Sequence, residues 1–174
     1  MNKSLDVAII IGSKSDLPII NETIKILDDF HIKYSLNIAS AHRTHDYLIK
    51  CIRDAETLGV NVFIAAAGMA AALPGFIASM TLLPVIGIPI ANVNCAGLDS
   101  LLSISQMPKG VPVATVSFDK TGAVNAAIFA VQILSIKCDN NTFCNSKRIR
   151  EQLKQYKNEM ENNIIQDNLN IIKS

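Results

Sequence analysis

Two short polar segments carry most of the side chains that could do chemistry in this sequence. They read GSKSD at residues 12–16 and SAHRT at residues 40–44. Each follows an apolar run typical of a strand and precedes a run typical of a helix, which is where a parallel sheet presents loops and helix N-termini to ligands. Together they supply hydroxyls, a carboxylate, an imidazole and a guanidinium. Such a set can hold a phosphorylated sugar and move one proton.

The first segment suits a phosphate and its sugar. Gly12 lets the chain turn sharply, and the Ser13 and Ser15 hydroxyls come beside the free N–H groups of a helix that opens near residue 16. Asp16 would repel a phosphate, so we expect it to accept hydrogen bonds from ribose hydroxyls. The alternative is that Ser15 or Asp16 only caps the helix, as Ser and Asp commonly do. Neither GxGxxG nor GxxxxGK[ST] is present, which excludes dinucleotide and P-loop interpretations.

The second segment supplies the group that could transfer a proton. His31 and His45 fall in a polar turn and in the first turn of a helix, so we expect both in solvent. His42 lies in the loop beyond the second strand, where an imidazole can take or give a proton near neutral pH. Arg43 beside it can hold phosphate or carboxylate through two parallel N–H donors. The alternative is a surface His-Arg pair without function, and the three histidines lack the spacing of a metal site.

A third segment, AAAGMAAALPG at residues 65–75, carries almost no polar side chains. If it binds a ligand, it does so with backbone groups around a small apolar cavity. Such a wall suits a flat heterocycle or carbon dioxide, which need exclusion of water more than strong contacts. Close packing of a helix on the sheet explains the small residues equally well, and composition does not separate the two.

The elements that position these segments follow from hydrophobic patterning. Residues 17–27 and 48–58 repeat apolar side chains at helical spacing and alternate with strand-like runs. Continuously apolar strands are typical of a parallel sheet covered on both faces, so the pattern predicts a doubly wound α/β fold. The expected strands are Val7–Ile11, Tyr34–Ile38, Val62–Ala66, Val85–Ile88 and Val113–Val116.

The C-terminal part is expected to form a helical extension. An Ala-rich helix at 125–134 should lie on the sheet, and a polar loop follows at 138–145. Beyond the loop, one face of an amphipathic helix is marked by Ile149, Leu153, Tyr156, Met160 and Ile164. We expect a catalytic domain at 1–136 and an extension at 137–174 that packs on a neighbouring subunit. The alternative is a helix folded back on its own domain.

Composition narrows the class of protein. The 174 residues are 49% hydrophobic and 18% charged, below the usual charged share of about 25%, which favours an oligomer. A net charge of +1 with no basic run before residue 147 argues against a surface that binds nucleic acid. No apolar stretch reaches about 18 residues and the N-terminus is too short and polar for a signal peptide, so we expect a cytoplasmic chain without membrane contact. The four cysteines form no CxxC pair, which favours free thiols over a Cys138–Cys144 disulfide.

The motifs taken together resemble one known family. GSKSD, SAHRT, the Ala/Gly segment ending in LPG, LPVIGIP at 83–89 and DSLLSISQMPKGVPVATV at 99–116 occur in this order. They resemble the 5-(carboxyamino)imidazole ribonucleotide mutases, the class I bacterial PurE family, over about residues 6–136. The resemblance implies a flavodoxin-like three-layer αβα sandwich with a five-stranded parallel sheet, assembled as a homo-octamer. It also implies a cofactor-free shift of a carboxylate from the exocyclic nitrogen to carbon 4 of the imidazole.

The resemblance also assigns residues. His42 corresponds to the general acid and base. The residues that correspond to substrate-binding positions are Ser13, Ser15, Asp16, Ser40, Arg43, Ala67, Gly68 and Leu73. The implied ligand is a small ribonucleotide, with neither metal nor cofactor.

The chain departs from the family pattern in the third segment. Ala66, Met69 and Ala72 stand where the family usually has Gly, Gly and His, and Leu17 and His45 replace a usual Trp and Pro. Met69 could narrow the base pocket or require an unfavourable backbone angle. Ala72 removes an imidazole.

Two alternatives follow from these departures. The first is the animal-type carboxylase, which adds carbon dioxide directly to aminoimidazole ribonucleotide and also lacks that His. Its usual SAHK and its different third segment argue against it, because this chain has SAHR. The second is a ribonucleotide-binding protein without catalytic activity.

Overall fold

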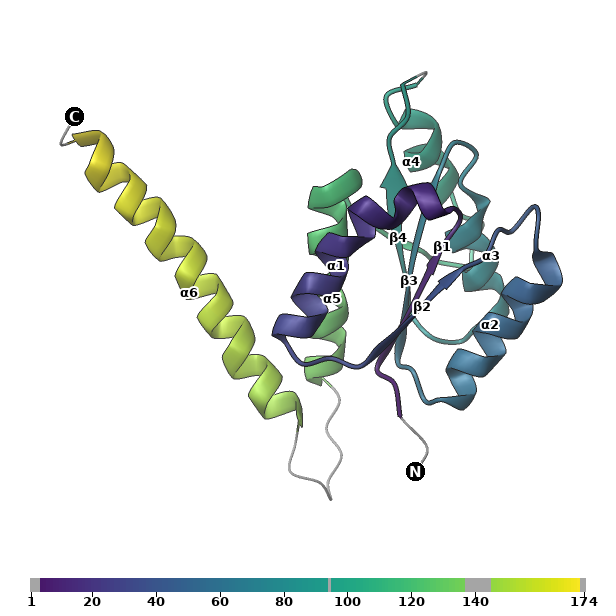
Figure 1. The fold of residues 1–174 in the computed structure, drawn as a ribbon, viewed down its shortest axis with the longest axis horizontal. Coiled ribbons are helices and arrows are strands. Elements are labelled where there is room, and N and C mark those ends of the chain that lie inside the picture. Colours follow the sequence, from purple (N-terminus) through teal and green to yellow (C-terminus); the bar gives the residue numbers. More distant parts are fainter. Residues whose placement is uncertain (1–3, 94, 137–144, 173–174) are drawn as a thin grey trace. The chain divides into compact units, whose positions relative to one another are not determined.

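The computed structural model describes residues 4–93, 95–136 and 145–172 (Figure 1). Strands and helices alternate along the described chain. In order they are β1 (Val7–Ile11), the 3-10 turn η1 (Lys14–Asp16), α1 (Leu17–Asp29), β2 (Tyr34–Ile38), α2 (His45–Thr57), β3 (Val62–Gly68), α3 (Ala72–Met80), β4 (Val85–Ile90), α4 (Leu98–Ser105), β5 (Ala114–Thr115), α5 (Asp119–Ile136) and α6 (Asn145–Ile172).

The five strands form one parallel sheet in the order β2-β1-β3-β4-β5. Every residue of β1 and β4 is buried, because both faces of a parallel sheet are covered by helices. The edge strand β2 is only half-buried over most of its length. The predicted strands are confirmed, although β5 is shorter than the expected 113–116. Val116 still donates its N–H to the Gly87 carbonyl of β4 at 3.1 Å, so the chain stays bonded to the sheet beyond the regular strand.

Helices cover both faces of the sheet, which makes a three-layer αβα sandwich (Figure 1). On one face Leu48 of α2, Ile77 of α3 and Ile104 of α4 share a core with strand residues such as Phe63. On the other face α1 lies against α5, where the Thr23 hydroxyl donates to the Ala123 carbonyl at 2.8 Å. The flavodoxin-like α/β prediction is therefore confirmed.

Helices α3 and α4 were not predicted as elements in their own right. They contain 9 and 8 residues, too few for a clear helical repeat, and α3 includes the sequence LPG. Close packing holds α4 in place. A Cβ atom added at Gly87 of β4 would lie 2.4 Å from the Ile104 side chain, so the helix needs a glycine beneath it.

The chain divides into two compact units, Met1–Val131 and Gln132–Ser174. In the second unit, Arg150 of α6 donates from Nε to the Ser135 carbonyl at 2.9 Å. The expected amphipathic helix is present, with Ile149 buried and Ile164 64% exposed. The expected loop at 138–145, with Cys138 and Cys144, lies outside the described residues except for Asn145, where α6 begins. No helix in the described part of the chain has the length and apolar character needed to cross a membrane.

Candidate active site

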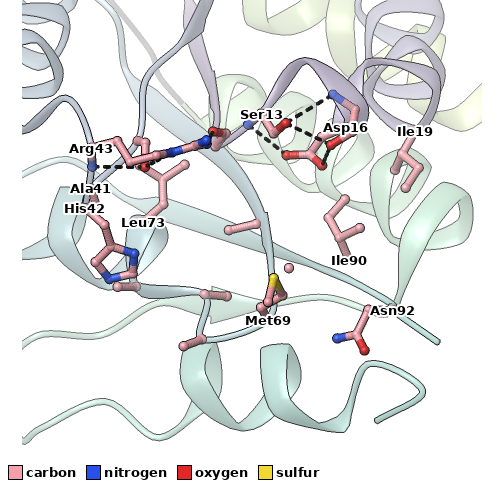
Figure 2. A pocket seen from close by; sticks show the side chains of 18 of the residues that line it. Ser13, Asp16, Ile19, Ala41, His42, Arg43, Met69, Leu73, Ile90 and Asn92 are labelled. Carbon is pink, nitrogen blue, oxygen red and sulfur yellow. Dashed lines mark hydrogen bonds between the residues drawn. The ribbon is translucent and has the colours of Figure 1, made fainter. Parts of the chain in front are cut away.

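One cavity of about 790 Å³ lies at the carboxyl ends of β1, β2, β3 and β4 (Figure 2). The rule for open parallel sheets places ligands at this edge. All nine residues assigned from the sequence line this cavity, so the fold brings them together while their roles stay predictions. They are Ser13, Ser15, Asp16, Ser40, His42, Arg43, Ala67, Gly68 and Leu73.

The loop after β1 is organised by its own side chains. The Ser15 N–H donates to the Ser13 hydroxyl oxygen at 3.3 Å, and the Ser13 N–H donates to Asp16 Oδ2 at 3.1 Å. These two bonds form a capping box around η1. The expected helix cap by Ser15 or Asp16 is not seen, because Asp16 is the N-cap of α1 without a side-chain cap bond and Ser13 caps η1 instead. This cap does not exclude ligand binding, because the exposed Ser15 hydroxyl still lines the cavity.

Asp16 is the one buried carboxyl group of the lining, with 7% of its surface exposed. Burial raises its pKa, while hydrogen bonds from the Ser15 hydroxyl and the Ser13 N–H oppose the rise. The result is a pKa above the usual value of a carboxyl group. When ionised, this group is a strong acceptor at the cavity wall, which suits neutral hydroxyl donors better than a phosphate.

The loop after β2 is tied to the loop after β1 by Arg43. Its Nη2 donates to the Gly12 carbonyl at 3.1 Å, and its backbone N–H donates to the Ser40 hydroxyl oxygen at 3.3 Å. The Ser40 N–H donates in turn to Thr44 Oγ1 at 2.8 Å. Arg43 therefore brings a permanent positive charge to the place where both loops meet.

His42 differs from its neighbours in having no fixed partner. Its side chain is exposed and forms no hydrogen bond within residues 4–93, 95–136 and 145–172. Figure 2 shows its ring well separated from Ser13 and Asp16. Both ring nitrogens are therefore available to a ligand, as a general acid and base requires.

The third wall runs from the end of β3 to the start of α3. Its side chains are those of alanine apart from Met69 and Leu73, with Gly68 at the strand end. A Cβ atom at Gly68 would come within 3.2 Å of the Ile90 carbonyl oxygen, so glycine allows β4 to approach closely there. Met69 has φ +58°, in the left-handed region that residues with side chains rarely adopt. The expectation of an unfavourable backbone angle at this position is confirmed.

Sequence reasoning missed the contribution of β4. Ile90, Ala91 and Asn92 also line the cavity, as does Ile19 of α1. The Asn92 amide is held by a hydrogen bond from Nδ2 to Asp99 Oδ2 at 2.7 Å. The position of Ala91 and Asn92 in the sequence could have identified them. They directly follow a buried parallel strand, as the GSKSD and SAHRT segments do.

The other two histidines lie away from the cavity lining. His31 Nδ1 is 3.1 Å from the Asp28 carbonyl oxygen, and His45 packs edge-on against Phe76 with ring centroids 4.8 Å apart. Both are exposed, as expected. Within the described ranges, three or more His, Cys, Asp or Glu side chains do not gather anywhere in a group that could hold a metal ion.

The chain is similar to known proteins over most of its length. The family model described as AIR carboxylase matches residues 6–163. The chain is 51% identical over 154 residues to the N5-carboxyaminoimidazole ribonucleotide mutase of Pyrococcus abyssi, covering 88% of this chain and 83% of that protein. It is 46% identical over 163 residues to the mutase of Saccharolobus solfataricus, covering 94% and 97%. Among solved structures it is similar to Treponema denticola PurE, with a TM-score of 0.80 and 29% identity over 92% of this chain and 94% of the other.

Proposed function

The chain belongs to the AIR carboxylase family, and from that premise we propose that it is an N5-carboxyaminoimidazole ribonucleotide mutase, an isomerase of purine biosynthesis. The observation that carries the proposal is the shared cavity of His42 and Arg43. It offers a proton carrier and an anion-binding group at one edge of the sheet. Relatives with the mutase name match from 74% to 94% of this chain at 46–51% identity.

The lining suggests how the substrate lies. The phosphate fits the hydroxyls of Ser13 and Ser15 together with the Arg43 guanidinium, which stands at the junction of the two loops. Ribose hydroxyls would then donate to Asp16. The imidazole ring would lie along the alanine-rich wall at 67–73, where backbone groups and small side chains admit a flat heterocycle.

The proposed reaction uses one proton carrier twice. The bond between the exocyclic nitrogen and the carboxyl carbon breaks, carbon dioxide is released, and the nitrogen takes a proton from the His42 imidazolium. Carbon 4 then attacks the carbon dioxide, and the neutral His42 removes the ring proton that is displaced. His42 ends in its starting state, so the step is an isomerisation without a cofactor. The phosphate and ribose contacts supply orientation.

The experiment that tests the function compares two substrates. Purified protein should convert the carboxyamino ribonucleotide into 4-carboxy-5-aminoimidazole ribonucleotide without added bicarbonate. Turnover of aminoimidazole ribonucleotide that depends on bicarbonate, with the carboxyamino compound left unused, would support the direct carboxylase instead. Binding of either ribonucleotide without product or hydrogen isotope exchange at carbon 4 would support a non-catalytic binding protein.

The apolar surface of the first unit supports self-assembly. Leu82 and Val93 are fully exposed, and Leu98 is 56% exposed. Large apolar side chains that are exposed on one monomer favour contact with other copies. We extend the proposal to a cytoplasmic homo-octamer in which residues 137–174 help to hold subunits together.

The assembly proposal is tested by mass in solution. Light scattering of the full chain should give the mass of eight copies. Removal of residues 137–174 should lower that mass or the melting temperature, because the exposed face of α6, which includes Met160 and Ile164, needs a cover. A truncated chain with unchanged mass and melting temperature would contradict this role.

A further inference from the structure

Met69 is the one long side chain between residues 67 and 72 of the cavity wall. Its neighbours in this stretch are alanines and a glycine, none of which can reach across the cavity. Met69 is 67% exposed although it lines the cavity, so its thioether chain lies at a surface that solvent reaches. In Figure 2 it stands in the middle of the view, between His42 on one side and Asn92 on the other.

The backbone at Met69 is held in an uncommon conformation. With φ +58°, the residue adopts a geometry that glycine accepts without strain and that methionine does not. The turn is closed by the Ala71 N–H, which donates to the Met69 carbonyl at 2.9 Å. Strained residues of this kind persist where the surroundings hold them, and they gather at functional sites. The strain therefore points to a use for the side chain.

The proposed reaction contains a species that polar groups hold only weakly. Between the breaking of the C–N bond and the forming of the C–C bond, carbon dioxide is neutral, has no donor and is a poor hydrogen-bond acceptor. The polar side of the cavity, with Ser13, Asp16 and Arg43, therefore makes only weak contacts with carbon dioxide. It stays near carbon 4 only if an apolar surface closes its way out.

We propose that the Met69 side chain is the cover that keeps the released carbon dioxide beside the imidazole ring until it is recaptured. Methionine suits the task because it is apolar, flexible and polarisable, so it can follow the shape of a bound ring. This role rests on the proposed mutase function. It adds a residue that determines how much of the transferred carboxyl group is retained.

The test follows the transferred carbon. The carboxyamino ribonucleotide is labelled with ¹³C in its carboxyl group and converted in excess unlabelled bicarbonate, and the label in the product is measured by mass spectrometry. Product formed per substrate consumed is measured in the same reactions. The variants are Met69→Ala, Met69→Leu and Met69→Gly. Met80→Ala is the matched control, because Met80 is a 41% exposed methionine outside the cavity lining.

The wild type and Met80→Ala should retain most of the label. In Met69→Ala and Met69→Gly the ratio of carbon dioxide escape to recapture should rise about tenfold. The reason is that losing part of the apolar cover lowers the free-energy barrier to escape, and about 1.4 kcal/mol of barrier corresponds to a tenfold change in rate. Met69→Leu should restore retention. Met69→Gly relieves the backbone strain, so it keeps the test valid if the alanine variant folds poorly.

Three outcomes would overturn the inference. If Met69→Ala and Met69→Gly raise KM but keep the label as the wild type does, the side chain packs on the substrate without retaining carbon dioxide. If the wild type itself loses the label, the cavity does not trap the gas. If the wild type forms no product from the carboxyamino ribonucleotide, the proposed function fails and this role fails with it.

Discussion

The two sides of the cavity are built on different physical principles. The side formed by the ends of β1 and β2 is polar and cross-linked, with Arg43 bonded to the Gly12 carbonyl and Asp16 bonded to the Ser13 N–H. The side formed by the ends of β3 and β4 is mostly apolar and rich in alanine, and its exposed methionine, Met69, has a strained backbone. The first side is suited to holding charge and moving a proton. The second is suited to excluding water from a ring and a gas.

The polar side therefore binds the substrate, and the apolar side confines the ring and the released carbon dioxide. A change on the polar side should appear as lost affinity or lost turnover, since the charged and proton-carrying groups of the cavity lie there. A change on the apolar side should appear in stability or in the fate of the carboxyl group.

Arg43→Ala should have the largest effect on binding. A charge-assisted hydrogen bond contributes about 1.5 to 3 kcal/mol, so affinity for the ribonucleotide should fall on the order of 10- to 150-fold. Arg43→Lys is the matched control, because it keeps the charge without the two parallel donors. Calorimetry with the ribonucleotide and with the nucleoside that lacks phosphate measures the effect. If the two ligands lose affinity equally, Arg43 ties the loops together without binding phosphate.

Ser15→Ala should have a smaller effect of the same kind. Its hydroxyl is neutral and exposed, and one such hydrogen bond is worth about 1 kcal/mol, or roughly a fivefold loss of affinity. The Ser13 cap on the Ser15 N–H is retained because alanine keeps that backbone group. The hydrogen bond from the Ser15 hydroxyl to Asp16 Oδ1 at 3.2 Å is lost, so the melting temperature should fall by no more than about 2 to 4 °C. A larger fall with unchanged affinity would show that Ser15 serves the fold instead.

Met69→Gly should be more stable than Met69→Ala. Both remove the side chain, but glycine accepts φ +58° and alanine does not. The left-handed conformation costs about 1 to 2 kcal/mol with a Cβ atom, and the greater freedom of unfolded glycine offsets about 0.4 to 1 kcal/mol of this. Denaturant unfolding should show a difference of about 0.5 to 1 kcal/mol. Equal stability would mean that the turn relaxes when the thioether is lost.

Asp16→Asn should have a small effect on stability, and the sign of that effect should depend on pH. Burial raises the pKa of Asp16 in the folded chain, so ionising this carboxyl group disfavours the folded state. The stability that its protonated form contributes is present at acid pH and is lost as the pH rises through the folded pKa. The variant should therefore melt higher than the wild type at neutral pH.

The advantage of Asp16→Asn should shrink on acidification, when the wild-type carboxyl group becomes neutral too. Thermal melting at a series of pH values measures it. A variant that melts lower than the wild type at neutral pH would contradict this prediction. It would show that the carboxylate stabilises the loop by accepting the hydrogen bond from the Ser13 N–H.

The sequence predicted the polar side of the site more completely than the apolar side. Continuous apolar runs identified β1 and β3, and the polar residues after β1 and β2 stood out because they interrupt that pattern. Asn92 was missed since a lone amide after β4 has no distinctive spacing, and its fixed orientation depends on Asp99, seven residues away. The short helices α3 and α4 owe their position to packing, as the contact of Gly87 with Ile104 shows. Packing of that kind leaves little trace in periodicity.

The most direct test of the account is the turnover of His42→Asn. His42 is the one imidazole of the cavity lining, and general acid and base catalysis contributes about a hundred- to ten-thousand-fold. We expect kcat for the carboxyamino ribonucleotide to fall by that factor, while the melting temperature and the Kd for the ribonucleotide stay close to those of the wild type. Near-normal kcat in this variant would contradict the account, because the polar side of the cavity would then not carry the proton.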